Sequence, residues 1–195
     1  MPDTIRDGTG GGNLAKVDDD NRVHTLSITE GVDRDANFRG EAYNLNTGTI
    51  TLTNATETPV AYLKNNEAKD LVIDAIAVGV DDSTGGDATF TYIKVIRNPT
   101  AGTIVSSPTT ADINSNRNYG SSKSLTVDWY KGATGDTMTD GEDHIIFGHN
   151  AGNRLFASIE EILPRGSTLG VKITPPPNNT SMTIYVALIC HLQEA

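Results

Sequence analysis

The last apolar stretch of the chain, residues 181–192, alternates with a period of two. One set of its side chains comprises Met182, Ile184, Val186, Leu188, Cys190 and Leu192, and the other comprises Thr183, Tyr185, Ala187, Ile189 and His191. This period is typical of a β-strand, in which successive side chains point to opposite faces of the sheet. Both sets contain apolar residues. We therefore predict a strand in the middle of a sheet, around which the preceding strands assemble.

Eight further segments between residues 49 and 174 show strand-like patterns. They are residues 49–53, 59–64, 71–80, 88–97, 124–131, 144–148, 155–163 and 169–174. Smaller strands are expected at residues 103–105 and near Ile113, within a long irregular stretch at 98–122. A second long polar loop covers residues 132–143, and no segment shows a convincing helical pattern. The sequence thus predicts an all-β fold, a jelly-roll-like β-sandwich of about eight strands.

Residues 1–40 differ in composition from the rest of the chain. They are rich in glycine and aspartate and contain few apolar residues. Such a segment buries too little surface to offset the entropy lost on ordering. We interpret it as an extended N-terminal docking arm that orders only against a partner or a neighbouring copy, and residues 41–195 as the β-sandwich domain. The residues expected to contact the partner are Ile5, Arg6, Gly8, Gly10, Leu14, Val17, Val23, Leu26 and Ile28.

Charge and cysteine content restrict the function further. The formal net charge of −10 over 195 residues would repel phosphate backbones, so we expect no nucleic-acid partner. No run of 18 apolar residues occurs, so we expect no membrane span. Residues 1–4 lack a secretory signal pattern, and synthesis in a cytoplasm is expected. Cys190 is the single cysteine, and its apolar neighbours favour a small buried side chain over a reactive thiol.

Candidate metal and nucleotide sites lack the required spacing. Residues 10–15 match G-x-G-x-x-A, but no strand precedes them and no helical pattern follows. His144 and His149 lie close to three acidic residues without the spacing of a zinc site. The acidic loop 136–143 does not have the spacing of an EF-hand. We therefore name no metal ligand and no cofactor.

The sequence also offers no catalytic constellation. There is no G-x-S-x-G elbow, and the many carboxylates are scattered along the chain. We name no catalytic residue and expect a protein that is not an enzyme. Tyr119, Trp129 and Tyr130 flank the loops, where aromatic side chains can stack on a sugar. Trp129, however, alternates in phase with Leu125 and Val127, which predicts that it packs in the core.

Several short segments, taken together, resemble a group of tailed-bacteriophage structural proteins. The segments are residues 5–10 (IRDGTG), 14–18 (LAKVD), 21–24 (NRVH), 43–52 (YNLNTGTITL), 95–104 (VIRNPTAGTI), 114–118 (NSNRN) and 170–176 (GVKITPP). The resemblance covers nearly the whole chain and points to the capsid cement, or decoration, proteins. Its motifs contain no catalytic residues, so no catalytic role is transferred.

This resemblance implies a role in the virion. Decoration proteins of this kind are commonly β-rich and often trimeric, and they use extended arms to staple shell subunits. We accordingly expect a homotrimer on the capsid surface whose partner is the major capsid protein. An arm of this kind gains affinity by laying its backbone beside a strand edge of another chain. The alternative is a tail or fibre module that binds a host receptor or glycan through loops 98–122 and 132–143.

Overall fold

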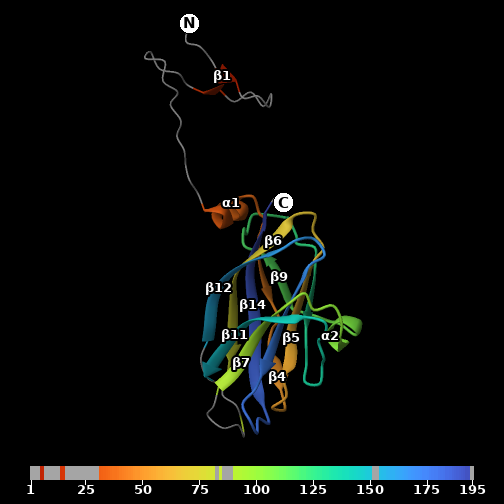
Figure 1. The fold of residues 1–195 in the computed structure, drawn as a ribbon. Helices are drawn as coiled ribbons and strands as arrows, with labels where there is room; N and C mark the ends of the chain where they lie inside the picture. The colour runs from red at the N-terminus through yellow and green to blue at the C-terminus, as the bar shows by residue number, and fades with distance from the viewer. Residues whose placement is uncertain are drawn as a thin grey trace. The chain divides into compact units, whose positions relative to one another are not determined.

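The chain divides into two compact units, Met1–Gly31 and Val32–Ala195. The computed structural model describes residues 5–6, 14–15, 31–81, 84, 90–150 and 154–193, with the side chains of residues 5–6, 14–15 and 113 left out (Figure 1). In the smaller unit, β1 (Ile5–Arg6) and β2 (Leu14–Ala15) form an antiparallel pair. Residues 32–40, which the sequence analysis assigned to the arm, belong to the larger unit.

The larger unit contains two antiparallel sheets packed face to face. The first sheet has the order β11 (Glu142–Asn150), β7 (Phe90–Arg97), β13 (Thr168–Thr174), β5 (Thr58–Asn65), β10 (Val127–Lys131) and β8 (Thr109–Thr110). The second has the order β12 (Arg154–Leu163), β6 (Asp70–Val80), β14 (Met182–Gln193), β3 (Ala42–Asn46) and β9 (Ile113–Asn116), and β4 (Ile50–Leu52) also pairs with β14. An all-β sandwich was predicted, and the structure confirms it.

The path of the chain through the two sheets is that of a jelly roll. The strands β3, β5, β6, β7, β11, β12, β13 and β14 follow one another along the chain. Consecutive members of this series lie in opposite sheets, except for β7 and β11, which pair with each other. They form the four-stranded arrays β11-β7-β13-β5 and β12-β6-β14-β3, and these eight strands with this alternation between two sheets match the jelly-roll arrangement. Residues 98–141 are an insertion between β7 and β11.

The core lies between the two sheets, and β14 runs through the middle of one of them. Met182, Ile184, Val186, Leu188, Cys190 and Leu192 are all buried, whereas the alternate residues from Thr183 to Ile189 are partly exposed. Leu188 lies opposite Leu45 of β3 and opposite Ile76 of β6. The prediction of a central, two-sided strand is therefore confirmed.

The described residues contain two short helices that the sequence pattern did not reveal. They are α1 (Val32–Phe38) and α2 (Thr103–Ser106), and α2 occupies residues for which a short strand was expected. Each helix makes two turns or fewer, and each has a single buried residue, Ala36 or Ile104. So short a helix shows no repeated apolar stripe in the sequence, and tertiary contacts decide its conformation.

The insertion covers part of the outer face of the first sheet. Ile104 of α2 and Met138 pack on Tyr62 and Ile96, which point outward from that sheet, and form a second, smaller apolar cluster. Gly170 of β13 lies directly beneath Met138, because a Cβ atom there would overlap the methionine sulfur. Loops 98–122 and 132–143 are thus held against the sandwich over part of their length.

The burial of Cys190 gives a simple chemical prediction. Its side chain is fully enclosed, and burial raises the pKa of the thiol well above its usual range. A thiol reagent such as DTNB reacts with the thiolate, so we expect native protein to react at least about a hundredfold more slowly than protein in denaturant. Absorbance of the released chromophore measures both rates. Equal rates would contradict the burial of this residue.

Candidate interaction surfaces

Large apolar side chains are exposed in two places on the described part of the larger unit. Val32, Phe38 and Tyr119 lie on or beside helix α1, and we call this place the α1 end. Phe90, Tyr92, Ile146, Phe156 and Ile162 lie on strands β7, β11 and β12, and we call this place the β11–β12 edge. Exposed apolar residues gathered in this way mark interaction sites more often than scattered ones do.

Helix α1 begins and ends with recognisable local signals. Asp33 and Asp35 stand in its first turn, where negative charge interacts favourably with the helix dipole. Gly40 follows the helix with a φ of 69°, a left-handed conformation that glycine adopts without strain. The N–H groups of Gly40 and Glu41 donate to the carbonyls of Asn37 and Ala36. This pair of hydrogen bonds is the Schellman motif, which terminates the helix.

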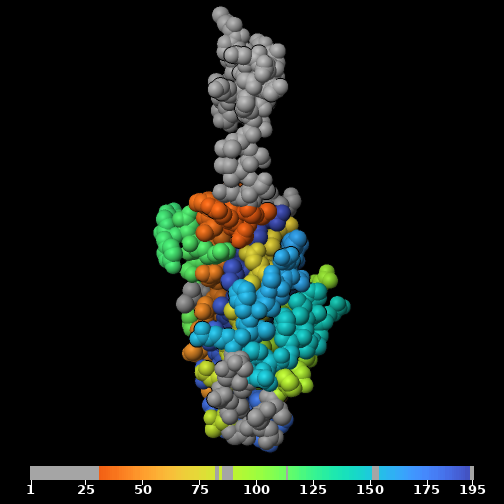
Figure 2. Space-filling model, turned by 90° about the vertical axis from the view of Figure 1, so that its left-hand side faces the viewer, coloured from red at the N-terminus to blue at the C-terminus, as the bar shows by residue number. Residues whose placement is uncertain are grey.

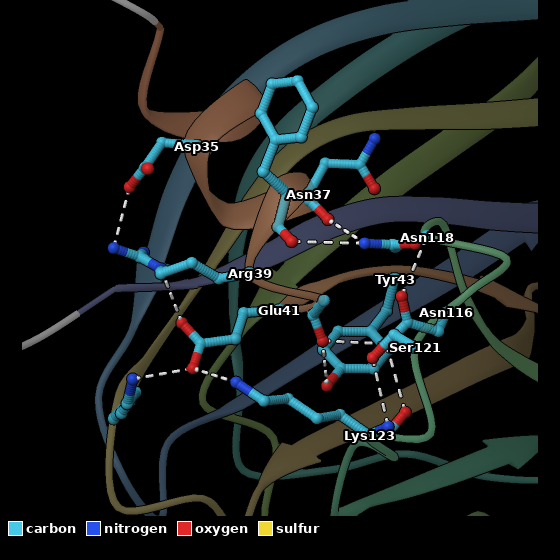
Figure 3. A network of polar contacts seen from close by, with 12 residues as sticks. Asp35, Asn37, Arg39, Glu41, Tyr43, Asn116, Asn118, Ser121 and Lys123 are labelled. Carbon is cyan, nitrogen blue, oxygen red and sulfur yellow. Dashed lines mark hydrogen bonds and ion pairs between the residues drawn. The ribbon is translucent and has the colours of Figure 1, made fainter.

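The carboxylate of Glu41 joins three cationic groups at the end of this helix (Figure 3). Its Oε1 lies 3.0 Å from the ammonium groups of both Lys69 and Lys123, and its Oε2 lies 3.1 Å from Arg39. Arg39 also pairs with Asp35, one turn earlier in α1, at 2.7 Å. Burial by itself would raise the pKa of Glu41, but the two lysines outweigh it and hold the pKa below its ordinary value of 4.5.

Two asparagines of the insertion bind the carbonyl groups at the end of α1 (Figure 3). The amide of Asn116 donates to the Gly40 carbonyl at 2.8 Å, and the amide of Asn118 donates to the Asn37 carbonyl at 3.0 Å. The Asn37 carbonyl is one of the last carbonyls of α1 and also accepts the Gly40 N–H, whereas the Gly40 carbonyl lies just beyond the helix. The insertion, α1 and the sandwich are therefore joined in one polar network at the start of the larger unit.

Sequence analysis did not find this network. Asn114, Asn116 and Asn118 were noted only as part of a resemblance, and Glu41, Lys69 and Lys123 were not singled out. Lys123 is 82 residues from Glu41 along the chain. The one available signal was Gly40, which follows the acidic residues Asp33 and Asp35 and is typical of a helix end. This signal does not indicate which distant side chains meet there.

The predicted contact residues of the arm lie in the smaller unit. Ile5 and Arg6 are in β1 and Leu14 is in β2, with Arg6 opposite Leu14 in the ladder. Gly8, Gly10, Val17, Val23, Leu26 and Ile28 lie outside the described residues. Their contact with a partner stays a prediction.

The β11–β12 edge is where both sheets end on the same side of the sandwich. Strand β11 is the last strand of the first sheet and β12 the last strand of the second. Figure 2 faces this side, and β12 (light blue) lies next to β11 (cyan) in it. Ile145, Phe147, Leu155, Ala157 and Ile159 point into the seam between the two strands and are only partly buried, although they pack on the core. The core is thus incompletely covered along this edge.

Two of the histidines and one residue of the acidic loop have clear partners within the fold. His144 Nε2 lies 2.7 Å from Glu161 Oε1 across the seam, and His191 Nδ1 lies 2.9 Å from Asp74 Oδ1. Asp136 accepts hydrogen bonds from the Thr103 hydroxyl and the Ala133 amide. Among the residues that the structure describes, no three His, Cys, Asp or Glu side chains gather as metal ligands would.

Two hollows are lined by residues of the β11–β12 edge. One, of about 450 Å³, lies between the sheets beside His144, Glu161 and Leu163. The other, of about 520 Å³, lies on the second sheet beside Asp74, His191 and Val32 of α1. Ile162 lines both. The two hollows extend the β11–β12 edge towards the α1 end.

The three loop aromatics have different environments. Trp129 is buried, as predicted, and its indole N–H donates to the Asn46 carbonyl at 3.2 Å. Tyr130 stacks on Tyr62 with a ring separation of 5.7 Å. Tyr119 is fully exposed. It is therefore the one of the three whose ring is free to stack on a ligand.

Comparisons with known proteins identify no relative of this chain. No protein-family model matches the chain, and no curated protein matches its sequence. Within the described residues, no helix is long and apolar enough to cross a membrane.

Proposed function

We propose that this protein is a structural virion component that decorates and stabilises a bacteriophage capsid by bridging shell subunits. It acts as a homotrimer, binds the major capsid protein through its N-terminal arm, and has no enzymatic role. The sequence resemblance first indicated this function. A jelly-roll domain with exposed apolar residues in two separate places is compatible with two kinds of contact, one to the shell and one to other copies.

The observation that carries the proposal is the polar network at the α1 end. It ties the start of the larger unit to the sandwich and to the insertion, directly after segment 1–31, which contains few apolar residues. An arm that bridges subunits transmits load to its domain only if the attachment point is fixed. Phe38, 64% exposed, and the fully exposed Tyr119 give the same end apolar groups for docking on the shell.

Deleting residues 2–30 tests this function, because the deletion stops before α1. We expect the shortened protein to melt within a few degrees of the full chain, since the core and the Glu41 network lie in the larger unit. We expect its retention on purified shells that lack the protein to fall at least about tenfold, because the backbone pairing of the arm is lost. Sedimentation of the shells followed by gel quantification measures retention.

A matched control replaces residues 2–30 with a Gly/Ser segment of equal length. This variant keeps the reach and the backbone of the arm but removes the side chains that enter pockets of the partner, so it should also bind more weakly than the full chain. Full retention of either variant would refute the docking arm. Decorated shells should also resist heating better than bare shells, and equal heat resistance would contradict a stabilising role.

The rival function is glycan or receptor binding on a tail or fibre, and the exposure of Tyr119 favours it. Aromatic rings that protrude from polar loops stack well on sugar faces. Substituting Tyr119→Ser discriminates between the two. Loss of binding to host-surface glycan, with no shell binding by the parent protein, would support the rival and overturn the capsid role.

A further inference from the structure

The larger of the two hollows lies on the second sheet and has an acidic lining, and we call it the acidic hollow. Its volume of about 520 Å³ falls in the range of roughly 300–1,000 Å³ that is usual for ligand sites. Its lining includes three carboxylates and three aliphatic side chains, which are Asp33, Asp74, Glu160, Val32, Val72 and Ile162. No lysine or arginine among the described residues lines it. The lining is therefore negatively charged whether His191 is neutral or protonated.

An interruption of the strand ladders brings carboxylates of neighbouring strands into this hollow. Ile73 and Ala75 of β6 have partners in both β12 and β14, but Asp74 between them has none in either ladder. At the same point of β12, Ile159 and Glu160 also lack ladder partners, and Glu160 has a φ of 49°. Such bulges re-aim side chains and are common beside functional sites. The irregular pairing thus accounts for the presence of Asp74 and Glu160 in one hollow.

The charge of the acidic hollow is only partly balanced within the fold. Asp74 lies 2.9 Å from the ring of His191. Asp33 and Glu160 are exposed, and neither carboxylate has an ion pair or a hydrogen bond with another described residue. Arg154, the one basic residue of β12, lies at the other end of that strand and does not line the hollow. Two carboxylates are thus available to a cationic group from another molecule.

The ring of His191 gives an independent indication of a missing partner. Its side chain lines the hollow and is 5% exposed. An ionised carboxylate only accepts hydrogen bonds, so the Nδ1 that faces Asp74 carries a proton, and Nε2 of the neutral ring is an acceptor. This buried Nε2 has no hydrogen-bond partner among the described residues. Because buried acceptors are nearly always satisfied, the unpaired Nε2 indicates a donor that these residues do not supply.

We propose that the acidic hollow binds an arginine side chain of a partner protein with a basic surface. A guanidinium group presents five N–H donors in one plane and can therefore bind several surrounding acceptors at once, whereas an ammonium group is a compact point charge. The apolar stem of an arginine packs along aliphatic walls such as those of Val32, Val72 and Ile162. Phe156, 66% exposed on the same face of β12, offers apolar surface to the residues that flank the arginine. Arginines seated in pockets are frequent anchors of protein interfaces.

The charge of this chain argues against a second copy as the occupant. The net charge is −10, and residues 1–30 contain six acidic and three basic residues, a net charge of −3. A negatively charged lining repels both the surface of another copy and its arm. A basic partner is attracted instead, and ion pairs between its arginine and the lining add specificity. The hollow thus provides a second binding surface besides the arm of the proposed function.

Fluorescence anisotropy of a labelled peptide with the full-length protein tests the proposal. The probe is a short amidated peptide in which arginine and valine alternate. Glu160→Gln and Asp33→Asn should each raise the dissociation constant of this peptide at least about tenfold, because each removes one partner of an ion pair that binding desolvates. Both variants should melt within a few degrees of the parent, since neither carboxylate has a partner among the described residues.

Glu142→Gln is the matched control. Glu142 is an exposed carboxylate of β11 on the same edge, but it does not line the hollow. This variant loses the same charge, and its affinity for the peptide should stay within about twofold of the parent. If it weakens binding as much as Glu160→Gln does, the peptide is held by general charge attraction and the proposal is overturned. A parent protein that does not bind the peptide at concentrations up to about 0.5 mM would overturn it as well.

Two further probes identify the occupant. The same peptide with lysine in place of arginine should bind at least about threefold more weakly, because an ammonium group lacks the planar fork that pairs with carboxylates. N-acetylarginine amide should bind at least about tenfold more weakly than the arginine peptide, because it makes no contact with the apolar surface beside the hollow. Equal affinity of the lysine peptide would overturn the assignment to arginine. Equal affinity of the single amino acid would indicate a site for a small cation and overturn the docking of a protein segment.

The acidic hollow is independent of the capsid role. Protein without residues 2–30 should keep its affinity for the arginine peptide within about twofold, because the hollow lies in the larger unit, although this protein is expected to bind shells poorly. Loss of peptide binding in this variant would contradict a site in the larger unit. A parent protein that binds the peptide with the expected pattern but binds no shells would refute the capsid role and support the arginine site.

Discussion

Substituting Leu188→Ala should reduce the free energy of unfolding by about 2–5 kcal/mol, the range measured when a large aliphatic side chain is removed from a well-packed core. Leu188 is fully buried, and its neighbours on both sides in the sheet, Leu45 and Ile76, are fully buried too. Paired strands on both sides hold the backbone, so the cavity cannot collapse easily. Urea denaturation monitored by Trp129 fluorescence measures the change.

The next residue along β14 provides the control. Ile189 has a similar volume, but it points to the outer face of the second sheet and is partly exposed. Ile189→Ala should therefore cost about 1 kcal/mol, a typical value for a point substitution. An equal loss of unfolding free energy in the two variants would contradict the structure, in which Leu188 faces the core and Ile189 faces outward.

The positions of the strands could be predicted from the sequence more reliably than the order of the strands in each sheet. The pattern of residues 181–192 predicted β14 and its central position because both of its faces carry apolar side chains. Residues 71–80 were also predicted as a strand, because they are rich in β-branched residues, and β6 pairs with strands on both sides. The alternation of apolar and polar residues depends only on which face of a strand each side chain occupies. A strand can therefore be predicted from it without knowing how the strands are ordered in the sheet.

Edges, in contrast, depend on topology. Residues 144–148 and 155–163 have apolar patterns like those of the other strands, yet β11 and β12 each end a sheet. The exposure of Ile146 and Phe156 follows from the order of strands, which a single sequence does not encode locally. Long-range side-chain contacts are hidden in the same way, and the binding of Lys69 and Lys123 by Glu41 joins three distant segments.

The boundary of the arm illustrates a third limit. Residues 32–40 are as polar as the residues before them, and composition alone assigned them to the arm. Their place in the larger unit depends on one buried alanine, a glycine that ends α1, and hydrogen bonds to asparagines of the insertion. Polar anchoring of this kind has no hydrophobic signature in the sequence.

Substituting Glu41→Gln should destabilise the protein by about 1–3 kcal/mol at neutral pH, because it removes the charge that accepts hydrogen bonds from Lys69 and Lys123. The side chain of Glu41 is 11% exposed, so water replaces these bonds poorly. Because the pKa of Glu41 is lowered in the folded protein, its charge stabilises the fold above the ordinary pKa of 4.5. The contribution declines as the pH falls below 4.5 and is lost once the pH passes the lowered pKa of the folded state.

The difference in unfolding free energy between parent and Glu41→Gln should therefore be large at pH 7 and shrink as the pH falls through this window. Glu57→Gln is the matched control, because Glu57 also binds two lysines, Lys94 and Lys172, but is 33% exposed and lies away from α1. Its loss should be about 0–1 kcal/mol, as for surface ion pairs. Hydrogen exchange adds a local test, since only Glu41→Gln should speed exchange of the Gly40 and Glu41 amides that close α1. Equal losses for the two variants, with unchanged exchange at α1, would show that the Glu41 network does not anchor the start of the domain.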